Sequence, residues 1–278
     1  MDLVQSIVLA TIQGISAWIP ISSKTQVILA ADALFKIPFH TAVAFALALH
    51  VGDLLAALYK YRTEYAEAFR QFVKPATLNQ FQTQTPQSIQ EARFLVLSVL
   101  ASAAVGLPAY LLLRQAFAGL SGEPLLFAIG LLLIGMAALT WHSRNAERKD
   151  KPLDLKTTLI TGAAQGLAVL PGISRSGITQ CTLLLQGVAQ ERAMRLSFLM
   201  SAPMIAAAVI AFQLVEGFGG LDPVLVLAGI AVSAIASLLT MDALTKIARK
   251  VPSWQFMAAI GALALVPFVL KIALNAVE

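Results

Sequence analysis

The sequence predicts an all-α integral membrane protein made of two inverted-topology repeats, each with one re-entrant helical hairpin and three transmembrane helices. The chain of 278 residues is 58% hydrophobic and 13% charged, whereas soluble domains carry about a quarter charged residues. Its mean hydropathy is +0.77, a value typical of polytopic membrane proteins. A second observation is that a similar polar motif occurs once in each half of the chain, both times inside an apolar stretch.

Six segments are apolar over the roughly 20 residues that a bilayer core requires. They are Phe39–Tyr61, Ala92–Leu113, Pro124–Trp141, Ala193–Phe212, Pro223–Leu244 and Ser253–Leu274. We expect each of them to form a transmembrane helix.

Two pairs of apolar segments are too short to cross the membrane. Leu3–Trp18 and Thr25–Phe35 flank Pro20, and Leu159–Leu170 and Ile178–Val188 flank Pro171. Short apolar segments paired around a proline are typical of re-entrant hairpins.

The order of segments predicts the inversion. A hairpin returns to its own side of the membrane and three spans cross to the other side, so the second half runs with opposite orientation. The predicted organisation is repeat one over residues 1–143, a cytoplasmic linker over 144–156 and repeat two over 157–278.

The distribution of basic residues predicts the orientation. Lysine and arginine are concentrated around residues 60–93, 144–156, 192–195 and 246–250, which the span count places on one side. The positive-inside rule assigns that side to the cytoplasm and both termini to the outside of a multi-pass plasma-membrane protein. Because these charges lie in loops between spans, the basic pI of about 9.5 does not indicate nucleic-acid binding, and no nucleic-acid partner is expected.

The first motif extends from Gln13 to Lys24 and is interrupted by Pro20. Ser22 and Ser23 follow the proline at the expected start of a new helix. Free N–H groups and the helix dipole favour a bound anion at such a terminus, and Lys24 adds a positive charge. The motif predicts an anion site, although the serines also fit a simple capping role.

The second motif offers a complementary set of groups. Gly172 lets the backbone approach a ligand closely, and Arg175 has a planar fork suited to phosphate. Ser174, Ser176 and Thr179 provide hydroxyls. An arginine at membrane depth predicts a functional site; the alternative is an arginine that extends from a helix end to the membrane surface. Together the motifs predict a pocket for a diphosphate.

A third polar element lies within the first predicted span. His50 and Asp53 are three residues apart and therefore share a helix face. The pair is suited to accept a proton or to hold a divalent cation on a diphosphate. The alternative is a polar pair that closes the helix bundle internally.

The motifs resemble the undecaprenyl-diphosphate phosphatase, or bacitracin-resistance, family, and the resemblance covers essentially the whole chain. The matching stretches are Pro20-Ile21-Ser22-Ser23, Pro171-Gly172-Ile173-Ser174-Arg175-Ser176-Gly177-Ile178-Thr179, and residues 195–203. The resemblance implies hydrolysis of a long-chain polyprenyl diphosphate to the monophosphate, which recycles the lipid carrier for cell-envelope glycan synthesis. It also implies Mg²⁺ or Ca²⁺ as a cofactor.

The resemblance further implies roles for individual residues. Ser23 is implied as nucleophile or direct phosphate ligand, and Arg175, Ser174 and Thr179 as diphosphate ligands. Positions 13, 17 and 26 depart from the family pattern, with Gln13 and Ala17 at usual glutamates and Gln26 at a usual histidine.

The departures are typical of either a divergent, archaeal-type member or an inactive variant. Ala17 removes the carboxyl group best suited to bind metal or take a proton. His50 with Asp53 then becomes the leading candidate base, and Asp53 the candidate metal ligand.

A second function also fits the pattern. Inverted repeats with broken helices at the midplane are used by transporters, so the alternative hypothesis is a transporter or flippase for polyprenyl phosphate. The expected partners are the polyprenyl diphosphate and membrane lipids. A homodimer is a further hypothesis, because the small residues of Ala259–Ala262 suit close helix packing.

Overall fold

The computed structural model describes residues 1–19, 22–73, 87–118, 151–169 and 173–247, with isolated residues between 131 and 142 and between 254 and 262. Helices are the regular elements over these ranges, so the all-α prediction is confirmed there. The predicted spans Pro124–Trp141 and Ser253–Leu274, most of the linker, and Ala259–Ala262 lie largely outside the described residues.

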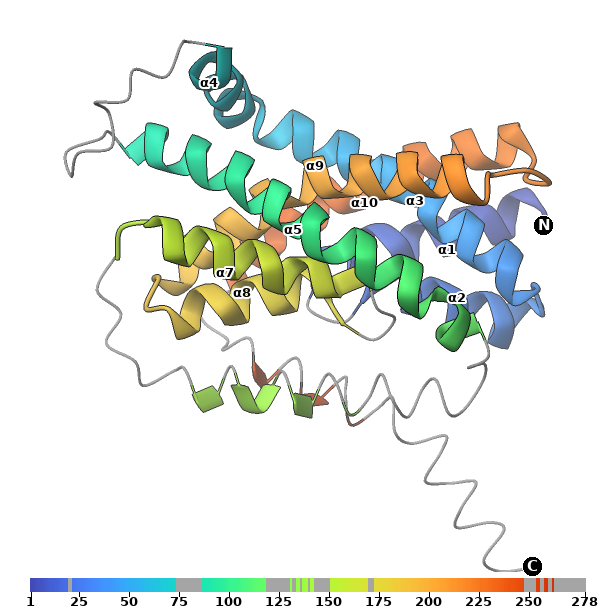
Figure 1. The fold of residues 1–278 in the computed structure, drawn as a ribbon. Coiled ribbons are helices and arrows are strands. Elements are labelled where there is room, and N and C mark those ends of the chain that lie inside the picture. The colour runs from blue at the N-terminus through green and yellow to red at the C-terminus, as the bar shows by residue number, and fades with distance from the viewer. Residues whose placement is uncertain are drawn as a thin grey trace, which may run out of the picture.

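Four described helices are long and apolar enough to cross a membrane. They are α3 (Phe39–Lys60), α5 (Gln87–Ala118), α9 (Gln190–Val215) and α10 (Pro223–Ile247). Their positions agree with four of the six predicted spans. The four helices run alongside one another in Figure 1, as expected for a polytopic membrane protein.

The short apolar segments form four shorter helices. These are α1 (Leu3–Ser16), α2 (Ser23–Phe35), α7 (Leu155–Gly166), which continues into a 3₁₀ turn, η2 (Leu167–Val169), and α8 (Arg175–Leu185). Helix α1 contacts α2, and α7 contacts α8. A further helix, α4 (Arg62–Val73), lies across one end of the bundle (Figure 1).

The third predicted short segment starts a full turn too late. The sequence pattern placed the start of the third short segment at Leu159, but α7 begins at Leu155. Asp154 caps the helix, because its side chain accepts a hydrogen bond from the backbone N–H of Thr157 at 2.7 Å. The prediction relied on apolar residues and overlooked this capping aspartate.

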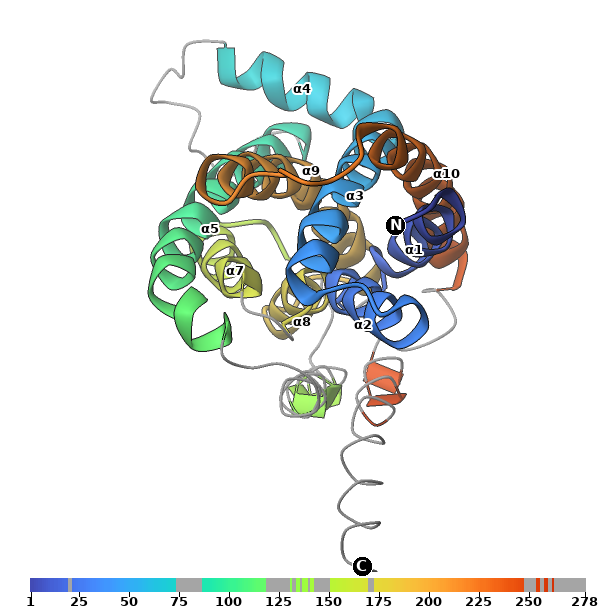
Figure 2. The same ribbon diagram turned by 90° about the vertical axis from the view of Figure 1, so that its right-hand side faces the viewer.

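Helices from the two halves of the chain pack against each other in two close pairs. Helix α1 lies along α10, and α7 lies along α5. Viewed end-on in Figure 2, these pairs occupy opposite sides of the bundle, with α3 between them. Each pair depends on glycine, because a Cβ atom at Gly14 would lie 2.6 Å from the Ser233 carbonyl oxygen and one at Gly162 would lie 2.4 Å from that of Ser98.

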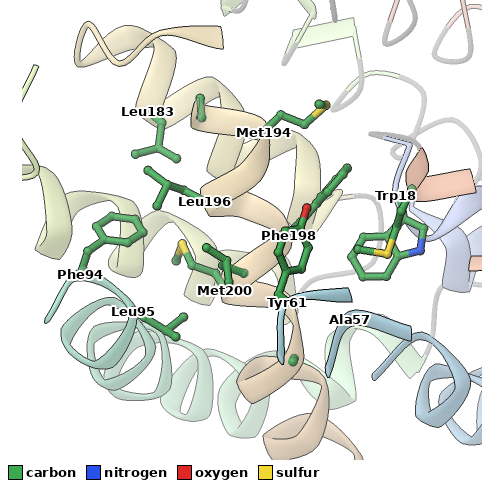
Figure 3. Close-up of a cluster of buried hydrophobic side chains, with 14 of the residues drawn as sticks. Trp18, Ala57, Tyr61, Phe94, Leu95, Leu183, Met194, Leu196, Phe198 and Met200 are labelled. Atoms are coloured by element: carbon green, nitrogen blue, oxygen red, sulfur yellow. The ribbon is translucent and has the colours of Figure 1, made fainter. Parts of the chain in front are cut away.

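The largest buried apolar cluster joins these elements around α9. Figure 3 shows Phe198 beside Trp18, with Leu196 and Met200 facing Phe94 of α5. The rings of Trp18 and Phe198 meet edge to face, with centroids 5.1 Å apart, a favourable geometry for aromatic rings. Trp18 follows α1 in the first motif, so this contact holds the end of that motif against α9.

We predict that Gly162→Ala lowers stability by about 1–3 kcal/mol, because the added methyl group overlaps the backbone of α5. The matched control is Gly219→Ala, where an added Cβ meets nothing within 4 Å. Thermal denaturation in detergent should show a lower midpoint for the first variant alone. Equal midpoints for the two variants would contradict the close packing of α7 on α5.

We predict that Asp154→Ala removes about 1 kcal/mol of stability at neutral pH by deleting the cap of α7. The hydrogen bond from the Thr157 N–H lowers the pKa of Asp154 below its ordinary value of 3.8. The ionised cap therefore contributes fully above that value, and the contribution is lost as the pH falls through the lowered pKa. Melting curves of both proteins should converge in strong acid and differ at pH 7; a difference independent of pH would refute the assignment.

Candidate functional site

The site is organised around the amide of Gln13, a fully buried side chain of α1. Its Nε2 donates to Ser23 Oγ at 3.1 Å and to Asp53 Oδ2 at 2.6 Å. The same nitrogen lies 3.2 Å from Nδ1 and 3.4 Å from Nε2 of His50. Gln13 therefore joins the start of α2 to both polar residues of α3.

His50 is oriented by its own helix. Its Nδ1 lies 2.7 Å from the backbone oxygen of Ala46. A carbonyl oxygen accepts hydrogen bonds only, so this contact assigns the proton to Nδ1 and leaves the lone pair on Nε2. The ring is half-buried and is thus placed to accept a proton through Nε2.

Asp53 is fully buried and bonded to a third helix. Its Oδ1 accepts hydrogen bonds from Ser237 at 2.5 Å and Ser233 at 3.1 Å, both on α10. Gly52 permits this approach, because a Cβ there would lie 2.5 Å from the backbone oxygen of Ile230. The sequence analysis missed both serines; their i, i+4 spacing in an apolar span was the available signal.

The second motif forms the start of α8. Ser174 is its N-cap, and its Oγ accepts a hydrogen bond from the Gly177 N–H at 3.3 Å. Ser174 Oγ also lies 3.2 Å from Ser176 Oγ. Thr179 Oγ1 lies 2.8 Å from the Arg175 carbonyl oxygen and 2.5 Å from Ser197 Oγ on α9. The first turn of α8 is therefore fixed by hydroxyl contacts. Ser197 lies in the matching stretch 195–203, but like Ser233 and Ser237 it had no role predicted from the sequence.

Arg175 occupies the first position of α8 and has an incomplete set of partners. Its Nη1 is buried and has no hydrogen-bond partner. Its guanidinium carbon lies 5.8 Å from the centroid of the Trp18 ring, within the range of a cation–π contact. A buried guanidinium donor without a partner is costly unless a ligand accepts its hydrogen bond.

The structure brings the two motifs together. Ser176 Oγ donates to the backbone oxygen of Ile19 at 3.2 Å, and Arg175 faces Trp18. The starts of α2 and α8 thus border one polar region.

Other predicted residues vary in their placement. Lys24 and Gln26 lie in the first turn of α2 and are half-buried. Ala17 follows α1 and belongs to the apolar cluster around α9. Gly172 lies outside the described residues.

The alternative of a simple side-chain capping role does not apply to Ser22. It occupies the N-cap position of α2 but forms no side-chain capping hydrogen bond. Its φ of 59° and ψ of 83° place it in the left-handed region, which is strained for a residue with a Cβ atom.

The described donor groups do not fit a protein-held divalent cation. No group of three or more His, Cys, Asp or Glu residues within the described ranges is placed to share an ion. The oxygens of Asp53 already accept hydrogen bonds from Gln13, Ser233 and Ser237. Ca²⁺ and Mg²⁺ require several oxygen ligands, commonly including carboxylates. Mg²⁺ or Ca²⁺ therefore stays a prediction from the family resemblance.

Comparison with known proteins identifies the family of this chain. The bacitracin resistance protein BacA family matches residues 6–266. The chain belongs to this family. The matched segment includes both motifs, as well as His50 and Asp53 of the third polar element.

Relatives from archaea match over nearly their whole length. A protein of Haloarcula marismortui is 34% identical over 94% of this chain and 95% of its own. A protein of Methanothrix thermoacetophila is 32% identical, and the match covers 95% of this chain and 96% of that protein. A protein of Pyrobaculum islandicum is 31% identical, and the match covers 99% of this chain and 100% of that protein. Each is named undecaprenyl-diphosphatase. The predicted family is thus confirmed, with archaeal relatives.

We predict that Asp53→Leu lowers stability by about 2 kcal/mol or more, because Gln13, Ser233 and Ser237 lose a shared buried acceptor. Asp53→Asn is the matched control. A rotated Gln13 amide can present its unpaired Oε1 to the new NH₂ group, so this variant should melt closer to the parent protein. Thermal denaturation in detergent provides the comparison, and identical midpoints for Asp53→Leu and the parent would rule out a structural role for the network.

Proposed function

We propose that this chain removes the terminal phosphate of a long-chain, undecaprenyl-type diphosphate and so recycles the lipid carrier used in cell-envelope glycan synthesis. The observation that carries the proposal is the buried, unpartnered Nη1 of Arg175 at the start of α8. Helix N-termini and guanidinium groups both bind phosphate oxygens favourably. The names of the archaeal relatives support the same substrate.

The balanced reaction converts the diphosphate and water to the lipid monophosphate and inorganic phosphate. The bond between the terminal phosphorus and the bridging oxygen breaks, and the bridging oxygen keeps the electron pair in the lipid product. Arg175 binds the charged oxygens, which lowers the cost of charge developing on the leaving group.

The attacking oxygen comes from Ser23 or from water. Ser23 Oγ accepts a hydrogen bond from Gln13, so its own O–H is directed elsewhere. Gln13 cannot act as a base, since an amide does not take up a proton at neutral pH. His50, with its lone pair on Nε2, contacts the same amide nitrogen and is the proposed proton acceptor.

The proposed architecture is a pair of inverted repeats with two re-entrant hairpins. Matching contacts in the two halves support it. A Cβ at Gly14 would lie 2.6 Å from Ser233 O and 2.9 Å from Ser237 N, and a Cβ at Gly166 would lie 2.7 Å from Ser102 O and 2.9 Å from the nitrogen four residues later. Each glycine follows a buried glutamine whose Oε1 has no partner.

The proposed location is the plasma membrane, with both termini outside and the basic loops in the cytoplasm. In this arrangement the starts of α2 and α8 enter from opposite faces and meet within the membrane. The contact of Ser176 with Ile19 supports such a meeting.

We predict that Arg175→Ala lowers phosphate release from farnesyl diphosphate by at least about 100-fold, as expected for loss of a charged group that binds the transferring phosphate. Arg175→Lys should retain part of the activity, because lysine keeps the positive charge but lacks the paired N–H donors of the guanidinium group. Arg70→Ala, which removes an arginine with a 72% exposed side chain, is the control for charge. Phosphate is measured colorimetrically on purified protein in detergent, with melting curves to verify folding.

Retained turnover in a folded Arg175→Ala protein would refute the proposed site. Absence of phosphate release from the unmodified chain, with or without Mg²⁺ or Ca²⁺, would refute the hydrolase. Transbilayer movement of a polyprenyl phosphate in proteoliposomes would then support the alternative transport function.

A further inference from the structure

The polar region around Gln13 carries an excess of positive charge. Lys24 and Arg175 are basic residues in the first turns of α2 and α8. Asp53 is the acidic residue of the network around Gln13, and neither basic residue forms an ion pair with it or with any other carboxylate in the described ranges. By formal charge, two basic side chains and one acidic side chain leave this region one charge positive, which is unfavourable at membrane depth without an anion.

Lys24 is positioned to share the anion with Arg175. It is the second residue of α2, directly after Ser23, and is half-buried. The N–H groups at the start of α2 have no intrahelical acceptors and carry the positive end of the helix dipole. The start of α8 also carries a basic residue, Arg175, in its first turn, and there the Ser174 side chain caps the Gly177 N–H. The two helix termini and two side-chain cations thus border one region.

The acidic side chain of the region, Asp53, already accepts hydrogen bonds from other protein groups. Both oxygens of Asp53 are engaged by α1 and α10, and position 13 is an amide. A metal ion held here would add two positive charges to a region that already carries an excess. The electrostatics and the available ligands therefore agree in disfavouring a protein-held cation.

We propose, on the basis of the function above, that Lys24 and Arg175 together neutralise the diphosphate in this chain, so that the substrate binds without a divalent metal ion. A diphosphate carries several negative charges, and the excess charge of the empty region is of the complementary sign. Lys24 supplies a compact charge, while Arg175 supplies paired hydrogen bonds.

The test measures binding separately from hydrolysis. The probe is a methylene-bridged diphosphonate analogue of farnesyl diphosphate, titrated calorimetrically into purified full-length protein in detergent with EDTA, with Mg²⁺ or with Ca²⁺. The expected dissociation constant is the same under all three conditions. In EDTA, Lys24→Gln should weaken binding by about 10–100-fold, the range for loss of a hydrogen bond to a charged group, and Lys24→Arg should restore most of it.

The matched control is Lys36→Asn, which removes a lysine at the other end of the same helix. Lys36 is exposed and left-handed, with a φ of 54°, a conformation that asparagine tolerates. This variant should bind the analogue as the parent does, and all variants are compared by melting curves to verify folding.

Binding that requires Mg²⁺ or Ca²⁺, or that is unchanged in a folded Lys24→Gln protein, would overturn the proposal. These outcomes do not depend on turnover. Tight metal-free binding lost in Lys24→Gln would support the inference even if the chain releases no phosphate, whereas the hydrolase itself fails only in the phosphate assay.

Discussion

The arrangement of the site depends on the hydrogen bond from Gln13 Nε2 to Asp53 Oδ2. Asp53 also accepts hydrogen bonds from two hydroxyls of α10, and Gln13 donates a hydrogen bond to Ser23 at the start of α2. One buried carboxylate therefore sets the spacing of four helices. Its burial is tolerable because its oxygens are supplied with donors, and each donor comes from a helix that glycine allows to approach. The polar site and the close packing are consequently parts of one arrangement.

Much of this arrangement follows from the sequence, for identifiable reasons. The apolar lengths predicted α3, α5, α9 and α10, because bilayer thickness fixes the length of a span. The motifs predicted the starts of α2 and α8, because proline and serine mark helix boundaries. Ser233, Ser237 and Ser197 were not found, since a hydroxyl in an apolar helix can also bond its own backbone. Only the packing of distant helices determines which of these serines has a buried partner.

Gln13 and Ala17 stand where the family resemblance implies acidic residues, and the structure gives each of them a physical role. An amide at position 13 donates to Asp53, where a second carboxylate would repel it. Ala17 packs in the apolar cluster beside Trp18. With fewer acids, the positive charges of Lys24 and Arg175 are not offset, and the balance of charge favours an anionic ligand directly. The residues at positions 13 and 17 are therefore consistent with a lysine directly after Ser23.

The packing of α1 on α10 has a consequence for biosynthesis. Ser6 Oγ donates to the backbone oxygen of Leu225, a residue made 219 positions later. At a ribosomal rate of about 5–20 residues per second, the first helix waits roughly 10–40 s for this partner. During that interval the glycine and glutamine of α1 face lipid or the insertion machinery, and Asp53 lacks its serines. The polar groups of α1 and α3 therefore stay without these partners until α10 has been made.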